Sequence, residues 1–166
     1  MVVFDASTLI LLAKAELIER FLLASSIEAV VPKEVAREAC EVKQSFDSLA
    51  IQQLISEKKI AVKMLKDRVL FEKFRSEMGL GAGEAEAIAL AVALKTDLVA
   101  TDDGRAIDAC KLTRIAFTSA IGILVRMYEK GAINKEEAVL KLAVLERNGR
   151  YGRSIMAVIR SRLEVT

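Results

Sequence analysis

Acidic residues directly follow two of the most apolar segments of this 166-residue chain. Asp5 follows MVVF at residues 1–4, and Asp102 and Asp103 follow DLVAT at residues 97–101. Each segment has the length and composition of a buried strand. Because adjacent aspartates at the end of a strand repel each other, we expect hydrogen-bond donors, water or a metal ion beside them.

Two predicted helices carry further acids that can join these aspartates. In KEVAREAC, Glu38 lies one turn after Glu34. In GEAEAIALA, Glu84 and Glu86 occupy the predicted first turn of an otherwise apolar helix. Residues two apart lie on roughly opposite sides of a helix, so we expect only one of these two glutamates to face the aspartates. The pattern leaves open which glutamate it is, and which aspartate of the adjacent pair.

The missing residue types narrow the chemistry of such a cluster. The chain has no histidine, which excludes Ser-His-Asp and Cys-His nucleophilic sites and histidine-ligated zinc. Cys40 and Cys110 belong to no CxxC motif, and we interpret both as small buried residues. Carboxylates without histidine or cysteine select Mg²⁺ or Mn²⁺. Such a site activates water and holds a phosphodiester for hydrolysis.

Hydroxyl and basic side chains near these acids could support the reaction. Ser7 and Thr101 can hydrogen-bond the carboxylates, and Ser7 also fits the N-cap of the following helix. The net charge is only +2, with the basic excess in residues 101–166. We therefore take Arg105, Arg150 and Arg153 as candidates for binding RNA phosphates, while a solvated helical face is the other interpretation.

The elements that must position these residues alternate between strand and helix patterns. Strands are expected at residues 1–4, 27–31, 59–65, 97–101 and 113–117. Helices are expected between them, with Pro32 at the first position of the helix that contains Glu38 and with a helix over 84–95. The alternation indicates an α/β fold with a central parallel sheet of four or five strands flanked by helices.

In such a sheet, ligands bind beyond the carboxyl ends of the strands. We expect the strands at 1–4 and 97–101 to be central neighbours, which would bring Asp5 to the aspartate pair. Residues 118–166 contain three helical patterns and no strand. We therefore predict a domain over residues 1–117 and a helical C-terminal extension over 118–166 packed on the same domain.

Hydropathy and the first residues indicate a cytoplasmic protein without membrane association. The apolar run at residues 87–94 is much shorter than the ~20 residues of a membrane span. The apolar start of the chain lacks the basic region of a signal peptide.

Four motifs together resemble the PIN-domain family, whose best-known members are the toxin ribonucleases of VapBC-type toxin–antitoxin pairs. The motifs are DASTLI at residues 5–10, VxxE at 35–38, GEAEAIALA at 83–91 and LVATDD at 98–103. Their order and spacing are similar to the family's. Beyond residue 117 the chain resembles the helical extension of an uncharacterised prokaryotic PIN subgroup, with GxL at residues 122–124.

The resemblance implies a PIN-like sheet flanked by helices, dependence on Mg²⁺ or Mn²⁺, cleavage of RNA and a homodimer. For a toxin it also implies an antitoxin protein as partner. The catalytic acids carried over by position are Asp5, Glu38, Glu86 and Asp103. Glu84 and Asp102 are the alternatives at the third and fourth positions, and all but Glu38 are candidate metal ligands. The family usually has aspartate at the third position.

The leading hypothesis is thus a metal-dependent ribonuclease. A toxin of a toxin–antitoxin pair is one form of this hypothesis. The alternative is a PIN-like module that binds RNA or protein with little catalysis, against which the retained acids argue. Receiver domains and aspartyl phosphatases place their paired acids after the first strand. Here the pair follows the fourth predicted strand, which argues against phosphotransfer on aspartate.

Overall fold

The five strands form one parallel sheet in the order β3-β2-β1-β4-β5. The structure is a computed structural model that describes residues 1–41 and 45–164. The strands are β1 (Val2–Phe4), β2 (Ala29–Pro32), β3 (Ile60–Lys63), β4 (Leu98–Ala100) and β5 (Ala116–Thr118). β1 and β4 are central neighbours, with Val3 paired to Val99, which confirms that part of the prediction.

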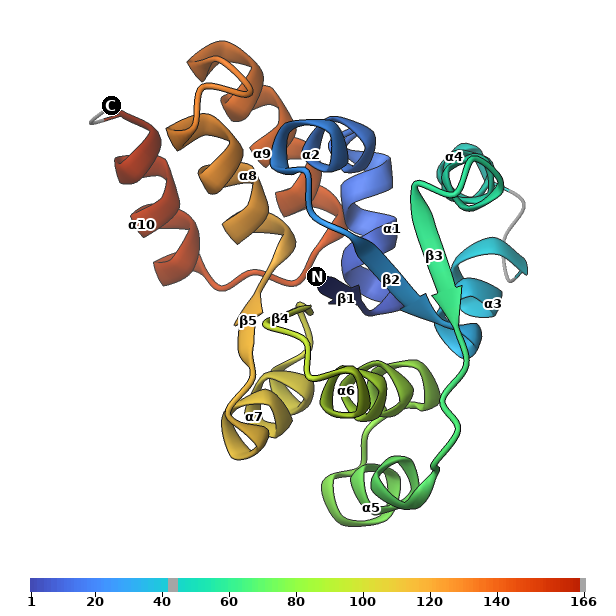
Figure 1. Cartoon of the computed structure of the whole chain (residues 1–166). Helices are drawn as coiled ribbons and strands as arrows, with labels where there is room; N and C mark the ends of the chain where they lie inside the picture. Colours follow the sequence, from blue (N-terminus) through green and yellow to red (C-terminus); the bar gives the residue numbers. More distant parts are fainter. Residues whose placement is uncertain (42–44, 165–166) are drawn as a thin grey trace.

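Ten helices in the described part of the chain surround the sheet. They are α1 (Ala6–Lys14), α2 (Ile18–Ser25), α3 (Lys33–Glu41), α4 (Phe46–Ser56), α5 (Val69–Met78), α6 (Ala82–Leu94), α7 (Gly104–Thr113), α8 (Ala120–Glu129), α9 (Lys135–Asn148) and α10 (Arg153–Glu164). Figure 1 shows α5, α6 and α7 on one side of the sheet, and α1, α2 and α8 on the other. The predicted α/β fold with C-terminal helices is confirmed.

The chain reverses its direction across the sheet between β1 and β4. From β1 it moves outward through β2 to β3, and then it crosses back to β4 and β5. Crossovers of opposite direction leave a crevice at the carboxyl ends of the two central strands. Backbone hydrogen bonds continue there, because the Asp5 N–H donates to Ala100 O (3.0 Å) and the Thr101 N–H donates to Thr118 O (2.8 Å). The backbone that carries the predicted acids is therefore held by the sheet.

Three local predictions were wrong in informative ways. Pro32 is the last residue of β2 and not the first of α3. Its missing N–H is tolerated because the pairing of β2 with β1 ends at Val30. The N-cap of α1 is Asp5, while Ser7 is a helical residue. α6 begins at Ala82, so the glycine-rich segment is partly helical and Glu86 belongs to the second turn.

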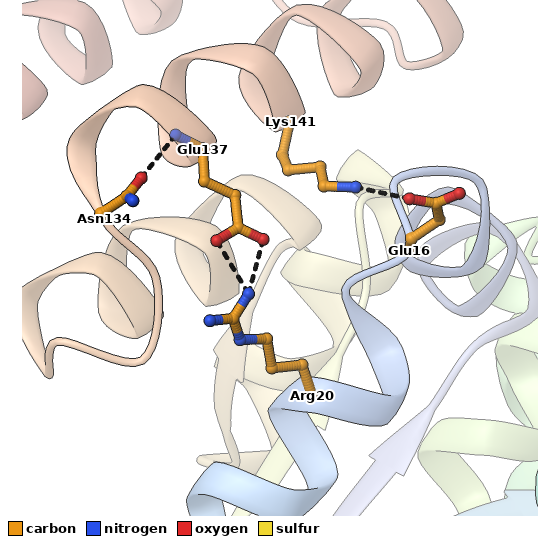
Figure 2. A network of polar contacts seen from close by, with 5 residues as sticks. All are labelled: Glu16, Arg20, Asn134, Glu137 and Lys141. Atoms are coloured by element: carbon orange, nitrogen blue, oxygen red, sulfur yellow. Dashed lines mark hydrogen bonds and ion pairs between the residues drawn. The ribbon is translucent and has the colours of Figure 1, made fainter.

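The C-terminal helices pack against the start of the chain. The buried core is one cluster that contains β1 together with Leu142 and Leu145 of α9. At the edge of this contact, Arg20 Nη1 of α2 donates to both carboxylate oxygens of Glu137, at 2.6 and 2.8 Å. Lys141 Nζ donates to Glu16 Oε2 at 2.7 Å (Figure 2). The two ion pairs hold α9 across the segment that links α1 to α2.

In residues 1–41 and 45–164, no helix combines the length and the apolar character needed to cross a membrane.

Candidate active site

Asp5 is the most buried acid at the carboxyl edge of the sheet, with 1% of its surface exposed. Its Oδ1 accepts hydrogen bonds from the Thr8 N–H (2.7 Å) and the Ser7 hydroxyl (3.1 Å), and its Oδ2 accepts one from the Thr101 hydroxyl (2.5 Å). Burial raises the pKa of Asp5 to about 6, although the hydrogen bonds from Thr101 and Thr8 lower it and nearby Asp102 raises it further. Burial removes the water that would stabilise the negative charge of Asp5. A bound cation could stabilise that charge instead.

Asp102 ties three separate segments to the end of β4. Its Oδ2 accepts hydrogen bonds from the Thr8 hydroxyl (2.7 Å) and from the Ala120 N–H (2.9 Å) at the start of α8. Its Oδ1 accepts one from the Tyr151 hydroxyl (2.8 Å), which lies between α9 and α10. Both carboxylate oxygens of Asp102 thus have donors from the protein.

Asp103 is the N-cap of α7, because its Oδ1 accepts a hydrogen bond from the Ala106 N–H at 2.9 Å. Its own N–H donates to the Thr101 hydroxyl oxygen at 3.2 Å, while that hydroxyl donates to Asp5. Thr101 therefore connects the two acids, as predicted for a supporting residue. Among the hydrogen bonds of the described residues, Asp103 Oδ2 accepts none, in contrast to both oxygens of Asp102.

Glu38 of α3 lies against the N-terminus of α6. A methyl group placed on Gly83 would lie 2.6 Å from Glu38 Oε2, so a glycine at this position leaves room for the carboxylate. Burial raises the pKa of Glu38, and the neighbouring charges of Glu34 and Glu84 raise it further, while a hydrogen bond from the Gly83 backbone lowers it. Glu38 and Glu84 are therefore electrostatic neighbours.

Glu84 and Glu86 have different surroundings, as their spacing predicts. Glu84 is half-buried in the first turn of α6 and lines a pocket together with Asp102 and Asp103. Glu86 is buried, and its Oε2 accepts a hydrogen bond from the Glu34 N–H at 2.8 Å. Glu86 thus supplies an acceptor to the first turn of α3, while Glu84 shares the lining of the pocket with the aspartate pair.

The pocket, called the acid pocket below, has a volume of about 360 Å³. It is lined by Ser7, Ile10, Leu11, Lys14, Glu84, Asp102, Asp103, Asn148, Gly149 and Arg150. Carboxylates form one part of the wall, and the cations Lys14 and Arg150 form another. This arrangement can hold a cation beside the acids and an anionic group beside the basic residues.

The other two predicted RNA contacts lie elsewhere. Arg105 Nη1 donates to Gly79 O at 2.8 Å, so its guanidinium contacts the end of α5. Arg153 is an exposed residue at the start of α10. Neither is among the described residues that line the acid pocket. The structure brings only Arg150 of the three predicted arginines to the acids.

Comparison of the sequence with models of known protein families shows which family this chain belongs to. The family model DUF3368, described as a PIN domain, matches residues 1–164. The chain belongs to the PIN-domain family. PIN domains are generally nucleases and usually use a divalent metal, which agrees at that level with a nucleic-acid hydrolase. The match extends past residue 117 and includes the C-terminal helices.

No curated protein and no solved structure matches this chain in the corresponding searches.

The carboxylates of this PIN domain have the chemistry that a hard divalent cation prefers. Glu84, Asp102 and Asp103 line the acid pocket, Glu38 of α3 is an electrostatic neighbour of Glu84, and Asp102 is an electrostatic neighbour of the buried Asp5. As arranged here, no three histidine, cysteine, aspartate or glutamate side chains of the described residues are close enough to hold one ion. Ligation would require the half-buried Glu84, Glu38 or Asp103 side chains to turn toward Asp5.

Sequence reasoning missed three residues to which the structure gives a place at this site, namely Lys14, Thr8 and Tyr151. Thr8 donates its N–H to Asp5 and its hydroxyl to Asp102, so it joins both strand ends. Its position three residues after the N-cap Asp5 is a signal that could have revealed the first contact. Tyr151 carries no comparable signal, because only the folded chain brings it to Asp102.

Proposed function

We propose that this PIN domain is a ribonuclease that depends on Mg²⁺ or Mn²⁺. The observation that supports it best is the burial of Asp5 at the carboxyl end of β1, beside the charge of Asp102 at the end of β4. A buried carboxylate beside other acids is costly to ionise unless a cation is bound. The family membership points to the same class of reaction.

Asp5, Asp103, Glu84 and Glu38 are the acids that would hold the ion. Glu84 is favoured over Glu86 because it shares the acid pocket with the aspartates, while Glu86 accepts a hydrogen bond from α3. Asp103 is favoured over Asp102 because its Oδ2 accepts no hydrogen bond from the described residues and is therefore open to an ion, whereas Asp102 holds Thr8, Ala120 and Tyr151. Bound Mg²⁺ or Mn²⁺ would supply Lewis-acid activation of water and would neutralise charge on the phosphodiester.

The protein's own residues have separate tasks in this proposal. Thr101 orients Asp5 through its hydroxyl and the Asp103 backbone through its oxygen. Ser7 donates to Asp5 at the rim of the acid pocket. Arg150 and Lys14 would bind the phosphates on either side of the cleaved bond, because cations on the pocket wall are suited to position the RNA backbone.

A PIN-like binding module with little catalysis is the second candidate. The observation that favours it is that Asp5, Asp102 and Asp103 all accept hydrogen bonds from the protein, and that three ligands do not converge within the described residues. In that case the same acids would stabilise helix N-termini, and the basic wall of the pocket would bind RNA or a protein.

Melting temperatures measured with and without millimolar Mn²⁺ separate the two candidates. An ion present at 100 times its dissociation constant stabilises the fold by about 2.7 kcal/mol. We expect this stabilisation for the wild-type chain and not for Asp5→Asn, followed by Mn²⁺-dependent cleavage of RNA that the substitution abolishes. If Mn²⁺ stabilises neither protein, the acids do not form a metal site and the binding module becomes the better proposal.

The family resemblance also supports a homodimer and, for a toxin, an antitoxin partner. Light scattering of the purified chain would measure its mass in solution. A small adjacent gene whose product suppresses the cleavage activity would support the toxin role.

A further inference from the structure

The segment between α9 and α10 reaches the acid pocket from the far end of the described chain. Asn148, Gly149 and Arg150 line the pocket, and the hydroxyl of Tyr151 donates to Asp102 Oδ1 at 2.8 Å. The other oxygen of Asp102 binds the Thr8 hydroxyl and the Ala120 N–H. Tyr151 thus completes a carboxylate that already fixes the first turns of α1 and α8.

Gly149 makes room for the Tyr151 ring. A methyl group placed on Gly149 would lie 2.3 Å from Tyr151 Cε2 and 2.9 Å from Leu145 O. The φ angle of Gly149 is −98°, which other residues adopt readily, so its backbone conformation does not require glycine. The close approach of the aromatic ring and the end of α9 requires it instead. Gly149 and Tyr151 together therefore place the Tyr151 hydroxyl on the Asp102 carboxylate.

We infer that Tyr151 is a positioning residue of the metal site, an inference that rests on the proposed function. By holding Asp102, it fixes the neighbouring Asp103 at the end of β4. Through Asp102 and Thr8 it also fixes the first turn of α1, which Asp5 caps. Groups that orient metal ligands in this way typically change metal affinity or activity by 10–100-fold when removed. The site of this PIN domain then depends on its C-terminal helices.

A merely structural tyrosine would also be half-buried and hydrogen-bonded, so the test must separate orientation from packing. Tyr151→Phe keeps the ring and removes only the hydrogen bond to Asp102. The matched control is Tyr128→Phe, which alters the only other tyrosine of the chain, a half-buried residue of α8. A second pair is Gly149→Ala, which displaces the Tyr151 ring, and Gly152→Ala, where the nearest atom to the added methyl is 4.0 Å away.

Each variant of the full chain is titrated calorimetrically with MnCl₂, and its metal-free melting temperature, kcat and KM for RNA cleavage are measured. We expect Tyr151→Phe and Gly149→Ala to weaken Mn²⁺ binding about tenfold and to lower kcat with KM nearly unchanged. Tyr128→Phe and Gly152→Ala should bind Mn²⁺ like the wild type.

Wild-type Mn²⁺ affinity in Tyr151→Phe would overturn the inference, even if this variant melts at a lower temperature. Equal weakening in Tyr151→Phe and Tyr128→Phe would overturn it too, since that result reports general packing. If the wild-type chain itself binds no Mn²⁺, the proposed function fails and the positioning role fails with it. The wild-type titration therefore distinguishes the two failures.

Discussion

Glu86 of α6 accepts a hydrogen bond from the backbone N–H of Glu34 at 2.8 Å, and this contact separates its role from that of Glu84. We predict that Glu86→Ala lowers the free energy of unfolding by about 1–2 kcal/mol, the usual effect of removing a helix cap, with Mn²⁺ affinity retained. Glu84→Ala should have the opposite profile, with nearly unchanged stability and Mn²⁺ affinity reduced at least tenfold. Urea unfolding and calorimetric titration of both variants provide the measurements. The reverse pattern would make Glu86 the metal ligand.

The buried Asp5 predicts a pH-dependent gain in stability for Asp5→Asn in metal-free buffer. Its pKa is raised from 3.8 to about 6, so ionisation of Asp5 destabilises the fold increasingly as pH rises from 4 through 6. Well below pH 3.8 the acid is protonated in both the folded and the unfolded chain, and this cost is absent. We expect Asp5→Asn to be about 1–3 kcal/mol more stable than the wild type at pH 7.5 and to lose most of this advantage at pH 4.

Urea unfolding of the two proteins at both pH values measures this difference, and other titrating groups cancel in the comparison. A difference that does not change with pH would show that Asp5 is ionised without cost in the folded chain.

Protons and metal should compete at the same carboxylates. Because Asp5 has a pKa of about 6 and the pKa of Glu38 is also raised, ligation must release protons when the pH is below that range. We expect the dissociation constant for Mn²⁺ to be nearly constant above pH 7 and to increase about tenfold per pH unit below pH 6. Titrations at pH 5, 6, 7 and 8 would test this, and a dissociation constant independent of pH would place the metal away from Asp5.

Arg150 should contribute to RNA affinity in a way that Arg147 does not. Both side chains are exposed, but Arg150 lines the acid pocket and Arg147, in the last turn of α9, is not among the described residues that line it. We predict that Arg150→Ala weakens binding of RNA of any sequence and reduces the slope of log K against log salt by about one. Arg147→Ala should leave that slope unchanged. Fluorescence anisotropy at several salt concentrations, with Asp5→Asn as background to prevent cleavage, measures both.

The C-terminal helices should unfold together with the rest of the protein. Leu145 of α9 is fully buried in the common core, so Leu145→Ala is expected to lower the free energy of unfolding by about 2–5 kcal/mol. Arg20→Ala removes a partly exposed ion pair with Glu137 and should cost less than about 1 kcal/mol. Circular dichroism should show a single transition for both variants. A separate early transition in Leu145→Ala would mean that residues 118–166 form an independent unit.

The strand order near the site could be predicted because it depends on local apolar runs and on where acids follow them. Asp5 and the aspartate pair were expected at one edge of the sheet, and the pairing of Val3 with Val99 confirms the strands that carry them. The choice between Glu84 and Glu86 could not be made, since both glutamates occur in the same helical pattern. It depends on where α3 crosses the start of α6, which is a tertiary relationship.

The role of Tyr151 was beyond the reach of the sequence for the same reason. Its contact with Asp102 joins residues 49 positions apart through the packing of α8 and α9, and no local pattern encodes it. The arginines show the opposite error, in which the sequence indicates residues that lie away from the site. Charge patterning selected Arg105 and Arg153 together with Arg150, but only Arg150 lines the acid pocket. Arg105 instead binds the end of α5, a carbonyl that becomes available only once that helix ends at Gly79.

The location of Arg150 and Tyr151 has a consequence for the protein during its synthesis. Ribosomes make proteins from the amino terminus, so a nascent chain contains Asp102 and Asp103 before the segment 148–150 that completes the lining of their pocket exists. If the site needs Tyr151 to orient its acids, a chain still being translated cleaves the RNA around it more slowly than the finished protein does. The order of residues would then delay full nuclease activity until translation has passed the turn between α9 and α10.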